Sequence, residues 1–167
     1  MKGAGSRKLS GSNRGRDHLP RVGSICIVSS CGGHLTEVLS LKSVYGLYDH
    51  SYVLNERIQL PEDMRGRTHF IVHAERDWRV LINLWEAWRF LRRERPALIL
   101  STGAGPIVPF AIVGLALGIP TVYVESASRT GPSLTGRIMY RIADRFFCQW
   151  KEHSRRFPRG TYGGLLP

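Results

Sequence analysis

Acidic residues are scarce in this chain of 167 residues, which has 13 aspartates and glutamates against 24 lysines and arginines. The resulting net charge of +11 favours polyanionic partners, and nucleic acid, anionic lipid and diphosphate-bearing substrates are all candidates. Cysteine is scarce too. The three cysteines are an odd number, so we expect reduced thiols in the cytoplasm. They are also too far apart for a zinc site.

Long apolar segments are also missing. No uncharged apolar run reaches the roughly 18 residues of a membrane span, and the best stretch, Ile107 to Ile119, has the length of a buried core helix. Residues 1–20 are basic and rich in glycine and serine, without the apolar core of a signal peptide, so we expect a disordered tail there. Residues 21–167, which keep +7 of the total charge, form one domain of ordinary size.

Several nucleotide-binding motifs are absent. The chain has no Asp-x-Asp, the usual metal clamp for a nucleotide diphosphate, so neither a metal nor a cofactor is expected. It has no Gly-x-Gly-x-x-Gly fingerprint and no Gly-Lys-Ser/Thr ending of a P-loop.

What the chain does contain is an alternation of short apolar runs with helical patterns. This alternation predicts an α/β fold, a Rossmann-like parallel sheet with helices on both faces. The expected strands lie at 24–30, 51–55, 68–73, 97–101, 121–125 and 145–150. The expected helices lie at 34–45, 77–94, 107–118 and 133–142, with a loop over 56–67.

Two glycine-rich turns, at residues 29–34 and 101–106, each follow a predicted strand and precede a predicted helix. Such turns lie at the carboxyl edge of a parallel sheet, where small residues let backbone N–H groups approach an anion. The alternative is a pair of tight turns without a ligand. The candidate substrate-binding residues of these turns are Gly32, Gly33, Thr102, Gly103 and Gly105.

His34 lies at the start of the first predicted helix, where the helix dipole favours a neutral imidazole that can accept a proton. This position suits a general base for an acceptor hydroxyl. The alternative is a histidine that caps the turn, or that hydrogen-bonds substrate without transferring a proton.

Glu125 ends a strand of otherwise uncharged residues. We expect this acid to face the crevice rather than be buried, because a buried carboxylate would need a partner inside the sheet. There it could bind sugar hydroxyls or act as the base, and a salt bridge to Arg129 is the alternative. Ser126 and Arg129 add donors for a diphosphate or a sugar ring.

The predicted helix over 77–94, which Asp77 can cap, combines tryptophans with arginines. It has a polar stripe and, opposite, an apolar side formed by Leu81, Leu84, Trp85, Trp88 and Leu91. Such a helix either lies on an anionic membrane or packs in the core with an arginine-rich solvated end.

From about residue 22 to 166, the sequence resembles the PssD/EpsE-type polysaccharide biosynthesis proteins, bacterial relatives of the eukaryotic Alg membrane-anchor subunit. Several separate blocks in the same order carry this resemblance. They are SCGGHLTE at 30–37, STGAG at 101–105, YVES at 123–126, PSLTG at 132–136, ADRFF at 143–147, QW at 149–150 and YGG at 162–164.

The resemblance implies the N-terminal half of a GT-B glycosyltransferase, similar to the acceptor half of MurG. In this family a separate PssE/EpsF-like chain binds the donor. The pair transfers a sugar from a UDP-sugar to a polyprenyl-diphosphate-linked glycan, with inversion and without metal, in exopolysaccharide or capsule synthesis. The resemblance places Gly32, Gly33 and His34 in the first loop, Gly103 and Gly105 in the second, and Glu125 where the family presents an acid to the active site.

The eukaryotic relatives carry an N-terminal transmembrane anchor, and a basic tail occupies its place here. The expected location is therefore peripheral, at the cytoplasmic face of the inner membrane. Because the chain ends after one α/β domain, we expect the isolated subunit to be inactive. The rival hypotheses are a non-catalytic scaffold that recruits the donor-binding subunit and a nucleic-acid-binding module. A nucleic-acid-binding module would leave the glycine loops without a role, so no nucleic acid is expected as a partner.

Overall fold

The computed structural model describes residues 23–55, 58–72, 79–128 and 130–166, so the predicted tail lies outside the described residues. The described residues form a seven-stranded parallel sheet in the order β3-β2-β1-β4-β5-β6-β7. Its strands are β1 (Ile25–Ser29), β2 (His50–Leu54), β3 (Thr68–Phe70), β4 (Leu98–Ser101), β5 (Thr121–Glu125), β6 (Arg145–Cys148) and β7 (Thr161–Tyr162).

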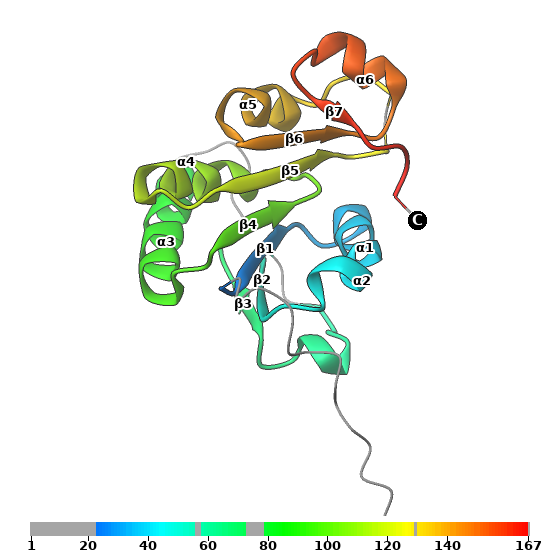
Figure 1. Cartoon of the computed structure of the whole chain (residues 1–167). Coiled ribbons are helices and arrows are strands. Elements are labelled where there is room, and N and C mark those ends of the chain that lie inside the picture. Colours follow the sequence, from blue (N-terminus) through cyan, green and yellow to red (C-terminus); the bar gives the residue numbers. More distant parts are fainter. Residues whose placement is uncertain (1–22, 56–57, 73–78, 129, 167) are drawn as a thin grey trace, which may run out of the picture.

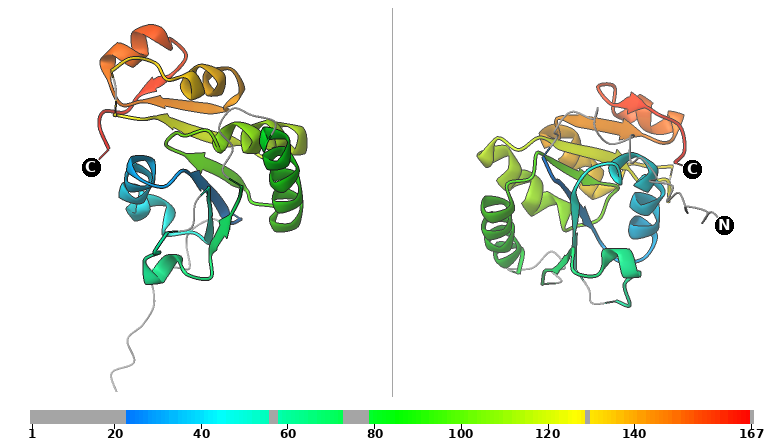
Figure 2. Two further views of the ribbon diagram at one scale, coloured as in Figure 1. Left: turned by 180° about the vertical axis from the view of Figure 1, so that it is seen from behind. Right: turned by 60° about the horizontal axis from the view of Figure 1, so that its bottom comes forward.

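Helices lie on both faces of this sheet (Figure 1). The helices are α1 (Gly33–Ser40), α2 (Lys42–Tyr45), the 3-10 helix η1 (Glu62–Met64), α3 (Arg79–Glu94), α4 (Ile107–Leu117), α5 (Leu134–Ile142) and α6 (Lys151–Arg156). Figure 2 shows α1 and α2 on one side of the sheet and α3 and α4 on the other. The predicted Rossmann-like architecture is confirmed.

Strand β1 separates two apolar cores because its side chains alternate between the two faces. Cys26 and Val28 pack into the core that includes Phe110 of α4. Ile27 points the other way, into the core that includes Val38 of α1. All five residues of β1 are buried, as expected for a strand at the centre of a sheet that is covered on both faces.

Several predicted boundaries are wrong. The helix expected over 34–45 is two helices, because the Leu41 amide donates to the carbonyl three residues back, at Val38, and interrupts the α-helical pattern. The loop expected over 56–67 contains η1, and the strand expected over 68–73 ends at residue 70. Neither α6 nor β7 was predicted.

Helix α3 turns part of its predicted apolar side to solvent. Leu81, Trp85 and Trp88 have exposed fractions of 67%, 59% and 41%. Asn83 is buried instead, because its Nδ2 donates to the Val72 carbonyl oxygen at 2.8 Å and so satisfies the backbone beyond β3. The core-helix interpretation is therefore wrong for these three apolar residues, although Leu84 and Leu91 do pack in the core. The predicted capping residue Asp77 lies outside the described residues.

Helices cover the α1–α2 face of the sheet only in part. A cavity of about 460 Å³ lies over β4, β5 and β6, and its apolar lining includes Leu100, Val122, Val124 and Phe147. Within the described part of the chain, no helix is both long enough and apolar enough to span a bilayer.

Candidate functional site

The first glycine turn positions His34 at the beginning of α1. Gly32 precedes the helix with a φ of 92°, a left-handed conformation that favours glycine. The imidazole of His34 projects from the first turn of α1 and remains 31% exposed. The predicted strand–turn–helix arrangement at this loop is confirmed.

The second glycine turn lies directly against the first. The Thr102 hydroxyl donates to the His34 carbonyl oxygen at 2.9 Å, although the two residues are 68 positions apart. Gly103 has a φ of 135°, and a Cβ on it would lie 2.6 Å from the Nδ1 and Cε1 atoms of His34. The imidazole therefore rests on the bare Cα of Gly103, and only glycine allows this approach.

Thr102 was predicted to bind substrate, but the side chain is fully buried and its hydroxyl is committed to the first loop. Gly105, by contrast, has open space where a Cβ would lie. In the second turn, Thr102 and Gly103 thus support His34, and Gly105 stays accessible to a ligand.

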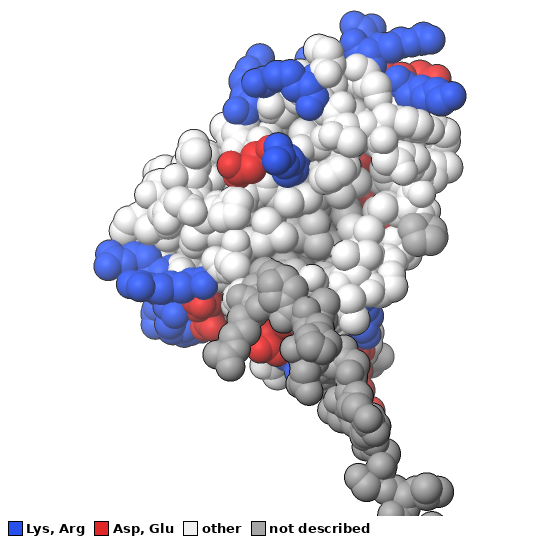
Figure 3. Space-filling model, viewed as in Figure 1, with Lys and Arg blue, Asp and Glu red and all other residues white. Residues whose placement is uncertain are grey.

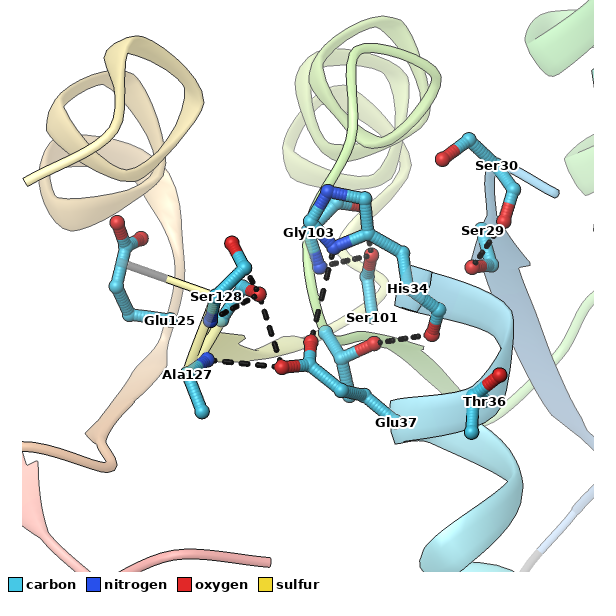
Figure 4. Close-up of polar contacts among 12 residues, drawn as sticks. Ser29, Ser30, His34, Thr36, Glu37, Ser101, Gly103, Glu125, Ala127 and Ser128 are labelled. Carbon is cyan, nitrogen blue, oxygen red and sulfur yellow. Dashed lines mark hydrogen bonds and ion pairs between the residues drawn. The ribbon is translucent and has the colours of Figure 1, made fainter. Parts of the chain in front are cut away.

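Glu37 joins these loops to a third one, and sequence reasoning did not select it as a site residue. Its Oε1 accepts hydrogen bonds from the Ser126 hydroxyl at 2.9 Å and from the Ala127 amide at 2.8 Å (Figure 4). Its Oε2 lies 3.7 Å from His34 Nδ1, beyond hydrogen-bond length but within the range of an ion pair. The available signal was its position three residues after His34, on the same face of a helix.

The environment of Glu37 favours its charged form. Burial opposes ionisation, but the neighbouring His34 ring and the hydrogen bonds from Ser126 and Ala127 outweigh it, so the pKa of this carboxyl lies below its ordinary value. Among the described residues, neither His34 Nδ1 nor Glu37 Oε2 has a hydrogen-bond partner. At 3.7 Å, each can compensate the other.

Glu125 is fully buried, which corrects the prediction that this acid would not be. Its Oε1 accepts a hydrogen bond from the Ser133 amide at 2.8 Å, at the N-terminus of α5, where the helix dipole stabilises a negative charge. A Cβ on Gly136 would come within 1.9 Å of Glu125 Oε2, so a glycine in α5 makes room for the carboxylate. The compensating partner is a helix terminus rather than a side chain.

His34 and Glu125 nevertheless line the same cavity, of about 250 Å³. The other residues around it are Ser126, Ser128, Ser133, Leu134 and Thr135. Figure 4 shows the Glu37 and Glu125 carboxylates on opposite sides of the turn that carries Ala127 and Ser128. The predicted Arg129 lies outside the described residues.

This cavity can hold a hydroxyl-bearing ligand. An imidazole, a carboxylate and several hydroxyl groups converge on it, and these groups suit hydrogen bonding to a sugar and proton transfer from one of its hydroxyls. The described ranges contain no group of three or more histidine, cysteine, aspartate or glutamate residues that could hold a metal ion.

Comparison with protein families and curated proteins gives this arrangement a context. A family model described as "Oligosaccharide biosynthesis protein Alg14 like" matches residues 64–166. The chain is similar to the human UDP-N-acetylglucosamine transferase subunit ALG14, with 28% identity over 191 aligned positions that cover 92% of this chain and 88% of that protein.

Two solved structures share the fold. Acinetobacter baumannii MurG has a TM-score of 0.66 and 14% identity over 86% of this chain. The UDP-N-acetylglucosamine 2-epimerase of Rickettsia bellii has a TM-score of 0.69 and 15% identity over 87% of this chain. The chain spans 44% and 45% of these two proteins. Because one is named as an epimerase, the shared fold by itself does not select an activity.

Proposed function

Because this chain belongs to the Alg14-like family of oligosaccharide biosynthesis proteins, we propose that it is one subunit of a two-component inverting glycosyltransferase. The pair transfers a sugar from a UDP-sugar to a polyprenyl-diphosphate-linked glycan, and this chain supplies the acceptor-facing half. We place it with the bacterial PssD/EpsE-type subunits of exopolysaccharide or capsule synthesis, with a PssE/EpsF-like chain as the donor-binding partner.

The observation that carries the proposal is the convergence of three loops on His34 and Glu37. The Nδ1 atom of this ring is buried beside the Glu37 carboxylate, so a substrate proton must reach the ring through Nε2. A carboxylate at Nδ1 favours the tautomer with its proton there, which leaves Nε2 as the acceptor. The geometry thus supports His34 as the general base.

In the proposed reaction, His34 takes the proton of an acceptor hydroxyl while the oxygen of that hydroxyl bonds to the anomeric carbon of the donor sugar. The bond from that carbon to the UDP oxygen breaks on the opposite face, and UDP leaves with the bonding electrons. Glu125 lines the same cavity and binds acceptor hydroxyls, and its firm hydrogen bond to the α5 terminus suits positioning better than proton transfer.

The need for a partner has a structural motive in addition to family membership. The apolar cavity over β4, β5 and β6 is lined by side chains such as Val122 and Phe147 together with Val44 of α2, which is 62% exposed. Burying such a surface against the donor-binding subunit would stabilise the pair.

Helix α3 carries an exposed aromatic and basic surface. Leu81, Trp85 and Trp88 are exposed on α3, and the guanidinium groups of Arg89 and Arg92 lie over the two indole rings. Aromatic and aliphatic side chains beside arginines are typical of helices that lie in a lipid interface. We propose that this helix holds the subunit peripherally at the cytoplasmic face of the inner membrane.

The test is a transfer assay with a UDP-sugar and a polyprenyl-diphosphate-linked acceptor. We expect no turnover by this chain alone and turnover when the donor-binding subunit is added. General base catalysis contributes about 10²–10⁴-fold, so His34→Ala in the pair is expected to lower turnover by that factor. Glu125→Gln is the companion variant.

Each part of the proposal can fail separately. Full turnover by the lone chain would contradict the two-component enzyme. Normal turnover by a pair carrying folded His34→Ala would remove His34 from the chemistry. If Glu125→Gln were also fully active, the chain would be a scaffold that recruits the transferase subunit.

A further inference from the structure

A second cavity lies outside the candidate active site, at the surface of α5 and α6, and has a volume of about 490 Å³. Four of its lining residues are arginines, Arg137, Arg141, Arg156 and Arg159, and Tyr140 lies among them. Figure 3 shows the basic side chains gathered over this end of the molecule, at the top of the view. We call this cavity the arginine pocket.

The positive charge of the arginine pocket has no internal compensation. No aspartate or glutamate lines the cavity, and among the described residues none of its four guanidinium groups forms an ion pair. Asp144, three residues after Arg141, does not line the cavity, and its Oδ2 accepts a hydrogen bond from the Thr121 amide at 2.7 Å. Like charges gathered around one cavity repel, and a bound anion relieves that repulsion.

Two of the arginines are already held in place by neutral oxygen atoms. Arg159 donates from Nη2 to the Tyr140 carbonyl oxygen at 3.2 Å, and its guanidinium carbon lies 4.7 Å from the centre of the Tyr140 ring. Arg141 donates from Nη1 to the Arg137 carbonyl oxygen at 3.1 Å. Each keeps its full charge and further N–H donors, so part of the ordering cost of binding is already met.

We propose that the arginine pocket binds a phosphate-bearing ligand. Arginine forks match phosphate oxygens in pairs, and the volume is within the range of small-ligand sites. The lining of the pocket shares no residue with that of the candidate active-site cavity, and Pro132 of the pocket directly precedes Ser133 of that cavity. The ligand is therefore a second anion, bound beside the N-terminus of α5 and not in the catalytic cavity.

The same chemistry occurs in a soluble phosphate or diphosphate and in the headgroup of an anionic lipid. The first arm of the experiment measures binding of inorganic pyrophosphate to the full chain by calorimetry at constant ionic strength. The test variant is Arg137→Gln/Arg156→Gln, because neither side chain makes a hydrogen bond within the described residues. The matched control is Arg145→Gln/Arg155→Gln, which removes two exposed arginines outside the pocket.

We expect saturable pyrophosphate binding, weakened about tenfold or more in the pocket variant and less than about twofold in the control, because charge-assisted hydrogen bonds are lost only in the first. The second arm measures flotation with phosphatidylglycerol vesicles. If the pocket variant loses binding in both arms, the ligand is a lipid headgroup; if it loses only pyrophosphate binding, the ligand is soluble.

Three results would overturn the proposal. One is the absence of saturable pyrophosphate binding together with unchanged flotation of the pocket variant. Another is equal weakening in the pocket and control variants, which would indicate a general charge effect. The third is tighter binding to a single-stranded RNA oligomer than to pyrophosphate. Circular dichroism of both variants checks that they fold.

Discussion

Glu37 provides the sharpest test of how the site is built, because one carboxylate connects α1 to the loop after β5. Charge-assisted hydrogen bonds contribute about 1.5–3 kcal/mol each, and Glu37 accepts two of them. Glu37→Ala removes both and leaves the Ala127 amide without its acceptor. Allowing for non-additivity, we expect a loss of about 2–4 kcal/mol in the free energy of unfolding.

Glu37→Gln is the finer change. The amide oxygen keeps the two donors, but both hydrogen bonds become neutral and the charge beside His34 is lost, so we expect a loss of about 1–2 kcal/mol at pH 7. The folded pKa of Glu37 lies below its ordinary value of about 4.3. The contribution of the ionised carboxylate to the free energy of unfolding is therefore complete above this ordinary pKa. It is lost as the pH falls through the lower pKa of the folded state.

The assay is urea unfolding of wild type and Glu37→Gln at pH 7, 5 and 3. The stability difference should be nearly constant from pH 7 to 5 and narrower at pH 3. Glu152→Gln, an exposed carboxylate on α6, is the matched control and should change stability by less than about 0.5 kcal/mol. A difference that is absent at pH 7, or equally large at pH 3, would refute the assigned role of Glu37.

Three further predictions follow from close contacts and from exposure. Gly103→Ala should lower transfer by the assembled pair at least as much as His34→Ala, because the new Cβ displaces the imidazole. Gly136→Ala should reduce the free energy of unfolding by about 1–3 kcal/mol, measured by urea unfolding, because its Cβ overlaps the buried Glu125 carboxylate. Trp85→Ser should weaken flotation with anionic vesicles roughly tenfold, yet change the free energy of unfolding by less than about 0.5 kcal/mol, because this side chain is 59% exposed.

Matched glycine variants distinguish these contacts from backbone effects. Gly118 has a φ of 71° and open space at its Cβ position, so Gly118→Ala carries the cost of placing alanine at a positive φ without touching the site. Gly131→Ala, which meets no atom within 4 Å, is the control for Gly136→Ala. If a control matched the loss of its partner variant, the contact with His34 or Glu125 would not be its cause.

The sequence predicted most of the sheet because its signals are local. An apolar run such as 97–101, bounded by proline and glycine, indicates a strand wherever it lies in the chain. Helix α5 was predicted with its capping residue for the same reason, and the Ser133 hydroxyl does accept a hydrogen bond from the Gly136 amide at 2.7 Å. The short elements α6 and β7 were missed because six and two residues carry too little periodicity.

The orientation of side chains was harder to predict because it depends on distant partners. Whether Trp85 and Trp88 face the core or the solvent is decided by how α3 packs on α4 and by the backbone group that Asn83 satisfies. The apolar pattern of the helix predicts neither the packing on α4 nor the hydrogen bond from Asn83. Periodicity identified the helix, and tertiary packing set its rotation.

For the candidate site, the sequence by itself determined that Glu125 ends a strand and that His34 begins the helix after the first glycine turn. Only the tertiary structure decided that Glu125 is buried under α5, and that Glu37 reaches partners about 90 positions away. The physical reason is that a charged group is stable in the interior only where compensating donors surround it. The donor to Glu125 is an amide only eight residues further along the chain, but the donors to Glu37 come from a segment about 90 positions away, which it meets only when the sheet assembles.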